Sequence, residues 1–313
     1  MAYTEREAAE TAQIVQAQKA FTEHRNAQAT LGALDFDYVW KAGADGEHLH
    51  KVSGAGQLLK DFGPRDAALE GIASSHAEKK AGAIQARDHW AREHAHMQRL
   101  NVANQVGRLL VTPVKVLEVL WQRGIMAYYT VIGTYAMYAY EAAAGIVFDE
   151  PTMATNDVDL FYTASKQMKF AEVVPGRRSM IEVLQEADPS FFRNEEQKES
   201  AMNGQGFSID FLRREEAEKF TDAFSISGAE GDIYPVKAKR SNRFLGSPSF
   251  EQVVIAVDGS MTLIRTIDPK TFMEFKEWMS GVPDREVLKR NRDKLQALAV
   301  KQLLAEGRLI SRL

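Results

Sequence analysis

The stretch YYTVIGTYAMYAYEAAAGIVFDEPTMATNDVDLFY, residues 128–162, decides the fold. An apolar run over residues 125–132 predicts a strand that ends at Gly133-Thr134. The small-residue run over residues 135–144 then predicts a helix, and a second strand-like run carries Asp157 and Asp159. Strand, glycine turn, helix and strand in this order predict a sheet that bears both acids on one strand.

Asp157 and Asp159 lie two residues apart on this predicted strand. Alternate side chains on a strand share a face, so we expect both carboxylates to point the same way while Val158 and Leu160 face the core. Neighbouring carboxylates repel each other, and each costs free energy unless a cation lies between them. A hard divalent cation such as Mg²⁺ takes oxygen ligands and suits this pair.

The turn at Gly133-Thr134 supplies the second half of the predicted site. Glycine lets the backbone approach a phosphate closely, and the N-terminus of the helix that follows favours anions. A phosphate cradle followed by a metal-binding pair of aspartates is the equipment for phosphoryl or nucleotidyl transfer.

These residues together resemble the signature of the polymerase-beta-type nucleotidyltransferase superfamily, in which a glycine and a small hydroxyl residue precede a strand with an Asp-x-Asp pair. The run AMYAYEAAAGIVFD…ATNDVDL further resembles a bacterial family known mainly as nucleotidyltransferase fold proteins. The gap from Gly133 to Asp157 is longer than in the minimal superfamily motif. We therefore interpret residues 148–155 as an insertion that could reshape the nucleotide pocket.

The resemblance implies a third carboxylate on a neighbouring strand, and the best candidate is Asp210 in the sequence GQGFSIDFLRR. Apolar side chains at positions 207, 209 and 211 alternate with more polar ones, which predicts a half-buried strand with Asp210 on its less apolar face.

The resemblance also implies that basic residues on the last two helices face the nucleotide phosphates. Asp268 followed by Pro269 predicts the start of the penultimate helix, and residues 283–305 are expected to form the last one. The matching nucleotide-binding residues are Lys276 on the first of these helices and, before Asp293 on the second, Lys289, Arg290 and Arg292.

Composition bounds the class of protein. The chain has 313 residues, a net charge of −4 and no cysteine, which argues against a passive nucleic-acid coat and excludes disulfide and thiolate chemistry. Its polar N-terminus is not a signal peptide, and no apolar run approaches the roughly 20 residues that a membrane helix needs. We therefore expect a cytoplasmic protein without a membrane partner.

The predicted fold is α+β, in three parts. Residues 1–106 form an N-terminal module of helices and a β-hairpin, residues 107–215 form the catalytic domain with its mixed sheet flanked by helices, and residues 216–313 form a hairpin and helical domain. Thr4 is expected to cap a helix over residues 4–28, and residues 65–106 are expected to form one long helix or a broken pair of helices. Both stretches carry few large apolar residues, which favours packing against the same chain or a second copy in a homo-oligomer. Shorter helices are expected over residues 166–174 and 178–186.

The predicted function is metal-dependent transfer of a nucleoside monophosphate from a triphosphate such as ATP to a hydroxyl group on RNA, protein or a small molecule. Mg²⁺ or Mn²⁺ would be held by Asp157, Asp159 and Asp210. Two other classes stay open: a catalytically silent module that binds a nucleotide or a partner, and a component of a toxin–antitoxin pair. Neither the acceptor nor the preferred base follows from the residues.

Overall fold

The computed structural model describes residues 3–163, 178–214, 225–229 and 231–313. The chain divides into two compact units, one formed by Met1–Ala12 with Asn104–Leu313 and the other by Gln13–Ala103. We call them the sheet unit and the N-terminal unit. The mixed α+β class is confirmed, whereas a separation between residues 107–215 and 216–313 stays a prediction. The helix predicted over residues 166–174 lies outside the described residues.

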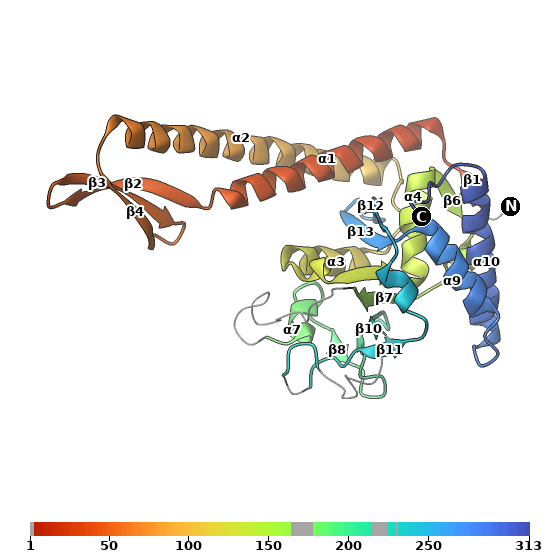
Figure 1. Cartoon of the computed structure of the whole chain (residues 1–313). Coiled ribbons are helices and arrows are strands. Elements are labelled where there is room, and N and C mark those ends of the chain that lie inside the picture. Colours follow the sequence, from red (N-terminus) through yellow and green to blue (C-terminus); the bar gives the residue numbers. More distant parts are fainter. Residues whose placement is uncertain (1–2, 164–177, 215–224, 230) are drawn as a thin grey trace. The chain divides into compact units, whose positions relative to one another are not determined.

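An eight-stranded mixed sheet organises the sheet unit, in the order β12-β13-β5-β7-β10-β9-β8 with β11 beside β10 (Figure 1). Strand β7 pairs antiparallel with β5 and parallel with β10. The strands are β5 (Tyr129–Ile132), β7 (Asp157–Tyr162), β8 (Phe192–Arg193), β9 (Ser200–Met202), β10 (Ser208–Arg214), β11 (Val236–Ala238), β12 (Ser249–Ile255) and β13 (Met261–Ile267).

Alternation along β7 divides the buried side chains between two cores. Val158 and Leu160 belong to the core that includes helices α3 (Val111–Gln122) and α7 (Met180–Leu184). Phe161 belongs to a second core, to which α4 (Ala136–Ala144), α9 (Pro269–Ser280) and α10 (Val287–Ala305) contribute. The remaining short elements of this unit are β1 (Tyr3–Glu5), β6 (Ile146–Phe148), α5 (Glu150–Met153), α8 (Asn242–Leu245) and the 3₁₀ turns η1 (Ile125–Ala127) and η2 (Gly133–Tyr135).

Two helix boundaries follow directly from local chemistry, as predicted. The carboxylate of Asp268 accepts a hydrogen bond of 2.8 Å from the backbone N–H of Lys270, and Pro269 occupies the first turn of α9. Helix α4 ends at Gly145, whose φ of 67° lies in the left-handed region that favours glycine.

Two other boundaries were predicted wrongly. Thr4 does not cap a helix: it lies in β1, which pairs antiparallel with β6, and α1 begins only at Ala8. The last helix begins at Val287 instead of Pro283, because Glu286 has an extended backbone with φ −49° and ψ 135°. At Thr4, pairing with a distant strand overrides a local helix pattern.

The N-terminal unit contains most of α1 (Ala8–Ala33), a three-stranded antiparallel sheet and the long helix α2 (Ala67–Ala103). The strands are β2 (Phe36–Gly43), β3 (Gly46–Ser53) and β4 (Leu58–Pro64). The structure thus adds a third strand to the β-hairpin that was expected in this part of the chain. His76 of α2 stacks on Phe36 of β2, and Gln13 of α1 donates a hydrogen bond of 3.0 Å to Asn101 of α2. A homo-oligomer formed through these helices stays a prediction.

None of the helices within the described ranges combines the length and the apolar character that crossing a membrane would require.

Candidate active site

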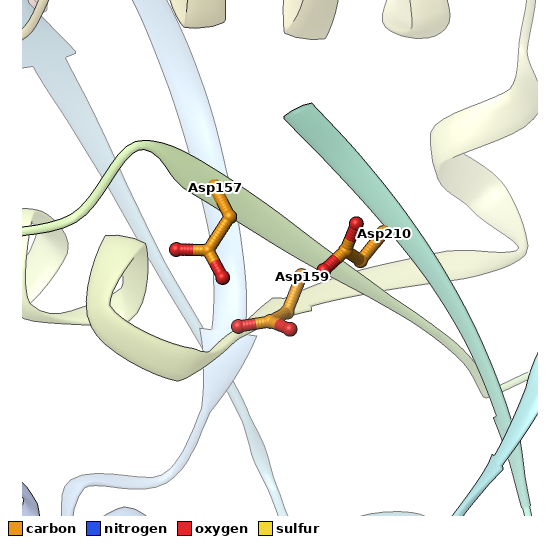
Figure 2. Close-up of side chains that lie close together, drawn as sticks. All are labelled: Asp157, Asp159 and Asp210. Atoms are coloured by element: carbon orange, nitrogen blue, oxygen red, sulfur yellow. The ribbon is translucent and has the colours of Figure 1, made fainter. Parts of the chain in front are cut away.

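Three carboxylates meet on one face of the sheet. Asp157 and Asp159 project from β7, and Asp210 projects from β10, where it is the direct neighbour of Asp159 in the parallel pairing (Figure 2). One oxygen from each acid lies within 4.8 Å of the others. Val158 and Leu160 are fully buried on the opposite face, as alternation predicts.

The cluster carries a strong mutual repulsion. Burial, followed by the charges of Asp157 and Asp210, raises the pKa of Asp159 to about 7, and the cations Lys276 and Arg285 offset this only in part. Burial and the charge of Asp157 also raise the pKa of Asp210, against an opposing contribution from the Ser200 side chain. Asp159 and Asp210 therefore hold their protons more tightly than isolated aspartates do.

The three acids fit a divalent cation. All three offer carboxylate oxygens, the ligands that Mg²⁺ and Mn²⁺ prefer. The Oδ1 atom of Asp210 is buried and has no hydrogen-bond partner in the described part of the chain. A buried acceptor without a partner is unusual, and a cation would satisfy it.

The backbone geometry at position 133 requires a glycine for two reasons. Its φ of 67° is left-handed, and a Cβ atom at this position would come within 1.9 Å of Oδ2 of Asp159. The clash would be with the carboxylate itself, so the turn lies directly against the acid cluster. Thr134, the next residue, is buried at 3% exposure.

A buried ion triad lies behind the acids. Nζ of Lys276 on α9 contacts Oδ1 of Asp293 on α10 at 2.8 Å, and Nε of Arg285 contacts Oδ2 at 2.5 Å. Asp293 has no exposed side-chain surface. Burial lowers the pKa of Lys276, and the contact with Asp293 opposes that shift. Both cations also act on Asp159, which places them at the site.

The other basic residues of α10 are distributed differently. Lys289 is exposed, and its charge offsets a small part of the rise in the pKa of Asp210. Arg292 donates from Nη1 to the backbone oxygen of Ala154, immediately before β7. Arg290 is half-buried, and its Nε atom has no partner among the described residues. The charge of Lys289 thus acts on Asp210, whereas Arg292 contacts the segment that leads to Asp157.

Comparison with known families decides the assignment. A family model described as Nucleotidyltransferase matches residues 112–312. The chain belongs to this nucleotidyltransferase family. In this nucleotidyltransferase the matched region contains the acid cluster, the Gly133-Thr134 turn and both C-terminal helices, whereas residues 13–103 lie outside it. No curated protein and no solved structure matches the chain.

Several residues at the site of this nucleotidyltransferase were missed by sequence reasoning. Arg285 was placed inside the last helix, although it precedes that helix. Thr155 donates a hydrogen bond to Oδ1 of Asp157. Gln296 donates to Oγ1 of Thr134 at 3.1 Å and to the backbone oxygen of Thr152 at 2.9 Å. The one available signal was position, since Gln296 lies one helical turn after Asp293.

Proposed function

We propose that this nucleotidyltransferase moves a nucleoside monophosphate from a nucleoside triphosphate to a hydroxyl acceptor, with a divalent cation bound at Asp157, Asp159 and Asp210. The observation that carries the proposal is the convergence of these three carboxylates from adjacent strands, within 4.8 Å of one another. When bound, Mg²⁺ or Mn²⁺ would supply Lewis-acid polarisation of the phosphate oxygens.

In this proposal the protein orients the triphosphate through two elements. The Gly133-Thr134 turn precedes α4, and the N-terminus of a helix favours an anion. Lys289, exposed and close enough to Asp210 to influence it, offers a cation to the outer phosphates. Lys276 is buried against Asp293, so its charge acts on the site at short range without solvent screening.

Asp210 takes a second role as the proton acceptor in this proposal. Its raised pKa makes it a better base than an ordinary aspartate. The acceptor oxygen forms a bond to the α-phosphorus while its proton passes to Asp210. The bond between the α-phosphorus and the bridging oxygen breaks, and pyrophosphate leaves with that electron pair. Arg290 and Arg292 add to the positive charge of α10 in this proposal.

The test is a calorimetric titration of each nucleoside triphosphate in Mg²⁺ and then in Mn²⁺, with total RNA absent and present. We expect one or more triphosphates to bind the wild type only when the cation is present. The Asp157→Ala/Asp159→Ala variant is expected to lose this binding, because its two strand ligands are gone.

A matched control is Glu78→Ala, which removes an exposed acid of α2, outside the matched region and the inserted segment. This variant should bind like the wild type. Absence of triphosphate binding to the wild type under all these conditions, or equal binding by the double variant, would contradict the proposed function.

A further inference from the structure

Gln296 joins the glycine turn to the inserted segment, two parts of the chain that precede β7. Its side chain has no exposed surface, and its Nε2 atom donates to Thr134 Oγ1 and to the backbone oxygen of Thr152. Thr134 and Thr152 are themselves buried, at 3% and 2% exposure. One amide of α10 therefore fixes the position of η2 relative to α5.

The contact with Thr152 also determines which way the amide points. A backbone carbonyl can only accept a hydrogen bond, so the Gln296 atom that faces it must be the NH₂ group. The same NH₂ group faces Thr134 Oγ1. Oε1 of Gln296 is buried and has no partner in the described chain, so the two donations define the amide's hydrogen bonding.

This orientation has a consequence for the hydroxyl of Thr134. A hydroxyl has one hydrogen and two lone pairs. Because Gln296 occupies a lone pair as a donor, the hydroxyl hydrogen is left to donate elsewhere. The structure gives no second hydrogen bond to this hydroxyl within the described residues. Gly133, its neighbour, already lies against Asp159.

We propose that Gln296 is a positioning residue that presents the Thr134 hydroxyl as a hydrogen-bond donor to a phosphate oxygen of the nucleoside triphosphate. The inference rests on the proposed function, because it requires a triphosphate at the acid cluster. Gln296 acts through Thr134, and no contact of Gln296 with the substrate is needed. The inserted segment that contains Thr152 thereby contributes to triphosphate binding by fixing the orientation of the amide.

The experiment measures the dissociation constant of the triphosphate that the wild type binds, in Mg²⁺, for a set of variants with melting curves recorded alongside. Thr134→Val removes the hydroxyl and should weaken binding about 10-fold or more, as expected for a hydrogen bond to a charged group. Thr134→Ser keeps a hydroxyl and should bind within about 2-fold of the wild type.

Substitutions at Gln296 separate its role from that of a packing residue. Gln296→Glu has nearly the same shape, but its carboxylate accepts the Thr134 hydrogen, so a loss of about 10-fold is expected. Gln296→Met lacks the donor and should lose affinity. Combined with Thr134→Val, it should add nothing further, because the hydroxyl that it positions is already absent. Gln302→Met, on the same helix, is the matched control and should bind like the wild type.

The failure of the inference differs from the failure of the proposed function. If the wild type binds no triphosphate, both are overturned. If the wild type binds and Thr134→Val weakens binding, but folded Gln296→Glu and Gln296→Met bind normally, only the positioning role is overturned. Losses that add in the double variant would likewise show that Gln296 acts independently of Thr134.

Discussion

Helix α3 of the sheet unit and helix α2 of the N-terminal unit form by different balances of forces. Helix α3 buries five of its 12 residues, all of them apolar. Helix α2 buries four of its 37 residues, and two of these are His76 and Asn101. Burial of apolar surface stabilises α3, whereas α2 depends on helix-forming residues and on contacts along its surface.

The ion pairs of the two units also differ in burial, and the sheet unit again has the more buried example. Lys276 and Asp293 of the sheet unit have side-chain exposures of 5% and 0%, whereas Lys80 and Asp37 of the N-terminal unit have 23% and 50%. A buried ion pair stabilises the fold only while both partners are present. An exposed ion pair changes the free energy of unfolding little, whether it is complete or broken. The same type of substitution should therefore have unequal effects in the two units, and four measurements test this contrast.

The largest difference is expected in catalysis. Asp159→Asn removes a cation ligand and should lower the transfer rate by roughly 10³-fold or more. Asp61→Asn, an acid of the N-terminal unit that contacts His48, should change the rate by less than about 2-fold, since a solvated surface pair is worth little. Pyrophosphate release with an acceptor that supports wild-type turnover measures both. A transfer rate for Asp159→Asn as little changed as that for Asp61→Asn would place catalysis outside the acid cluster.

The next largest difference between the two units is expected in the stability lost when a lysine is removed. Lys276→Met leaves Asp293 buried with only Arg285 as its cation, and should lower the free energy of unfolding by about 3 kcal/mol. Lys80→Met should cost less than about 1 kcal/mol. Urea unfolding of both variants checks the difference. A cost at Lys80 as large as that at Lys276 would contradict the contrast.

The pH dependence of the sheet unit should come partly from Asp159. Its pKa is about 7 in the folded chain and near the ordinary 3.8 when unfolded. Between these values the folded state binds more protons, so stability falls as the pH rises. The melting temperature of the metal-free wild type should drop by a few degrees, relative to Asp159→Asn, from pH 5 to pH 8. Added Mg²⁺ should reduce that drop, and an unchanged difference would contradict cation binding.

The stability of the N-terminal unit should depend on pH more weakly and with the opposite sign. Burial, with the charges of His24 and Arg25, lowers the pKa of His94 from 6.5 to about 4. Between these values the unfolded state binds more protons, so stability is lost as the pH falls. Between neutral pH and pH 5, the melting temperature of His94→Gln should fall by one or two degrees less than that of the wild type. His89→Gln, at an exposed position, is the control and should behave like the wild type.

Sequence reasoning located the acid cluster because its geometry is periodic. Two residues apart on a strand means one face, and Asp157 and Asp159 obey that rule. The family resemblance implied a third carboxylate, and an alternation of the same kind on β10 made Asp210 the candidate. The register that makes it the neighbour of Asp159 was not readable, because strand pairing is set by the packing of both faces.

Arg285 and Gln296 were missed for a different reason. Apart from its position one helical turn after Asp293, Gln296 has no sequence feature that distinguishes it from a surface glutamine, and its partner Thr134 lies 162 residues away. Arg285 follows a proline that resembles a helix start, yet its contact with Asp293 and the extended backbone of Glu286 delay the helix. A hydrogen bond between distant segments leaves no periodic trace in either of them.

By itself, the sequence determined which residues could share a face, where α9 and α4 are capped, and that three acids belong to two strands. These properties depend on neighbours within a few positions, where backbone geometry and side-chain spacing are fixed. Only the tertiary structure decided that Asp159 and Asp210 are adjacent, that Asp293 holds Lys276 and Arg285, and that Gln296 reaches Thr134. Those contacts form because the cores bring distant segments together, and burial then makes each polar group require a partner.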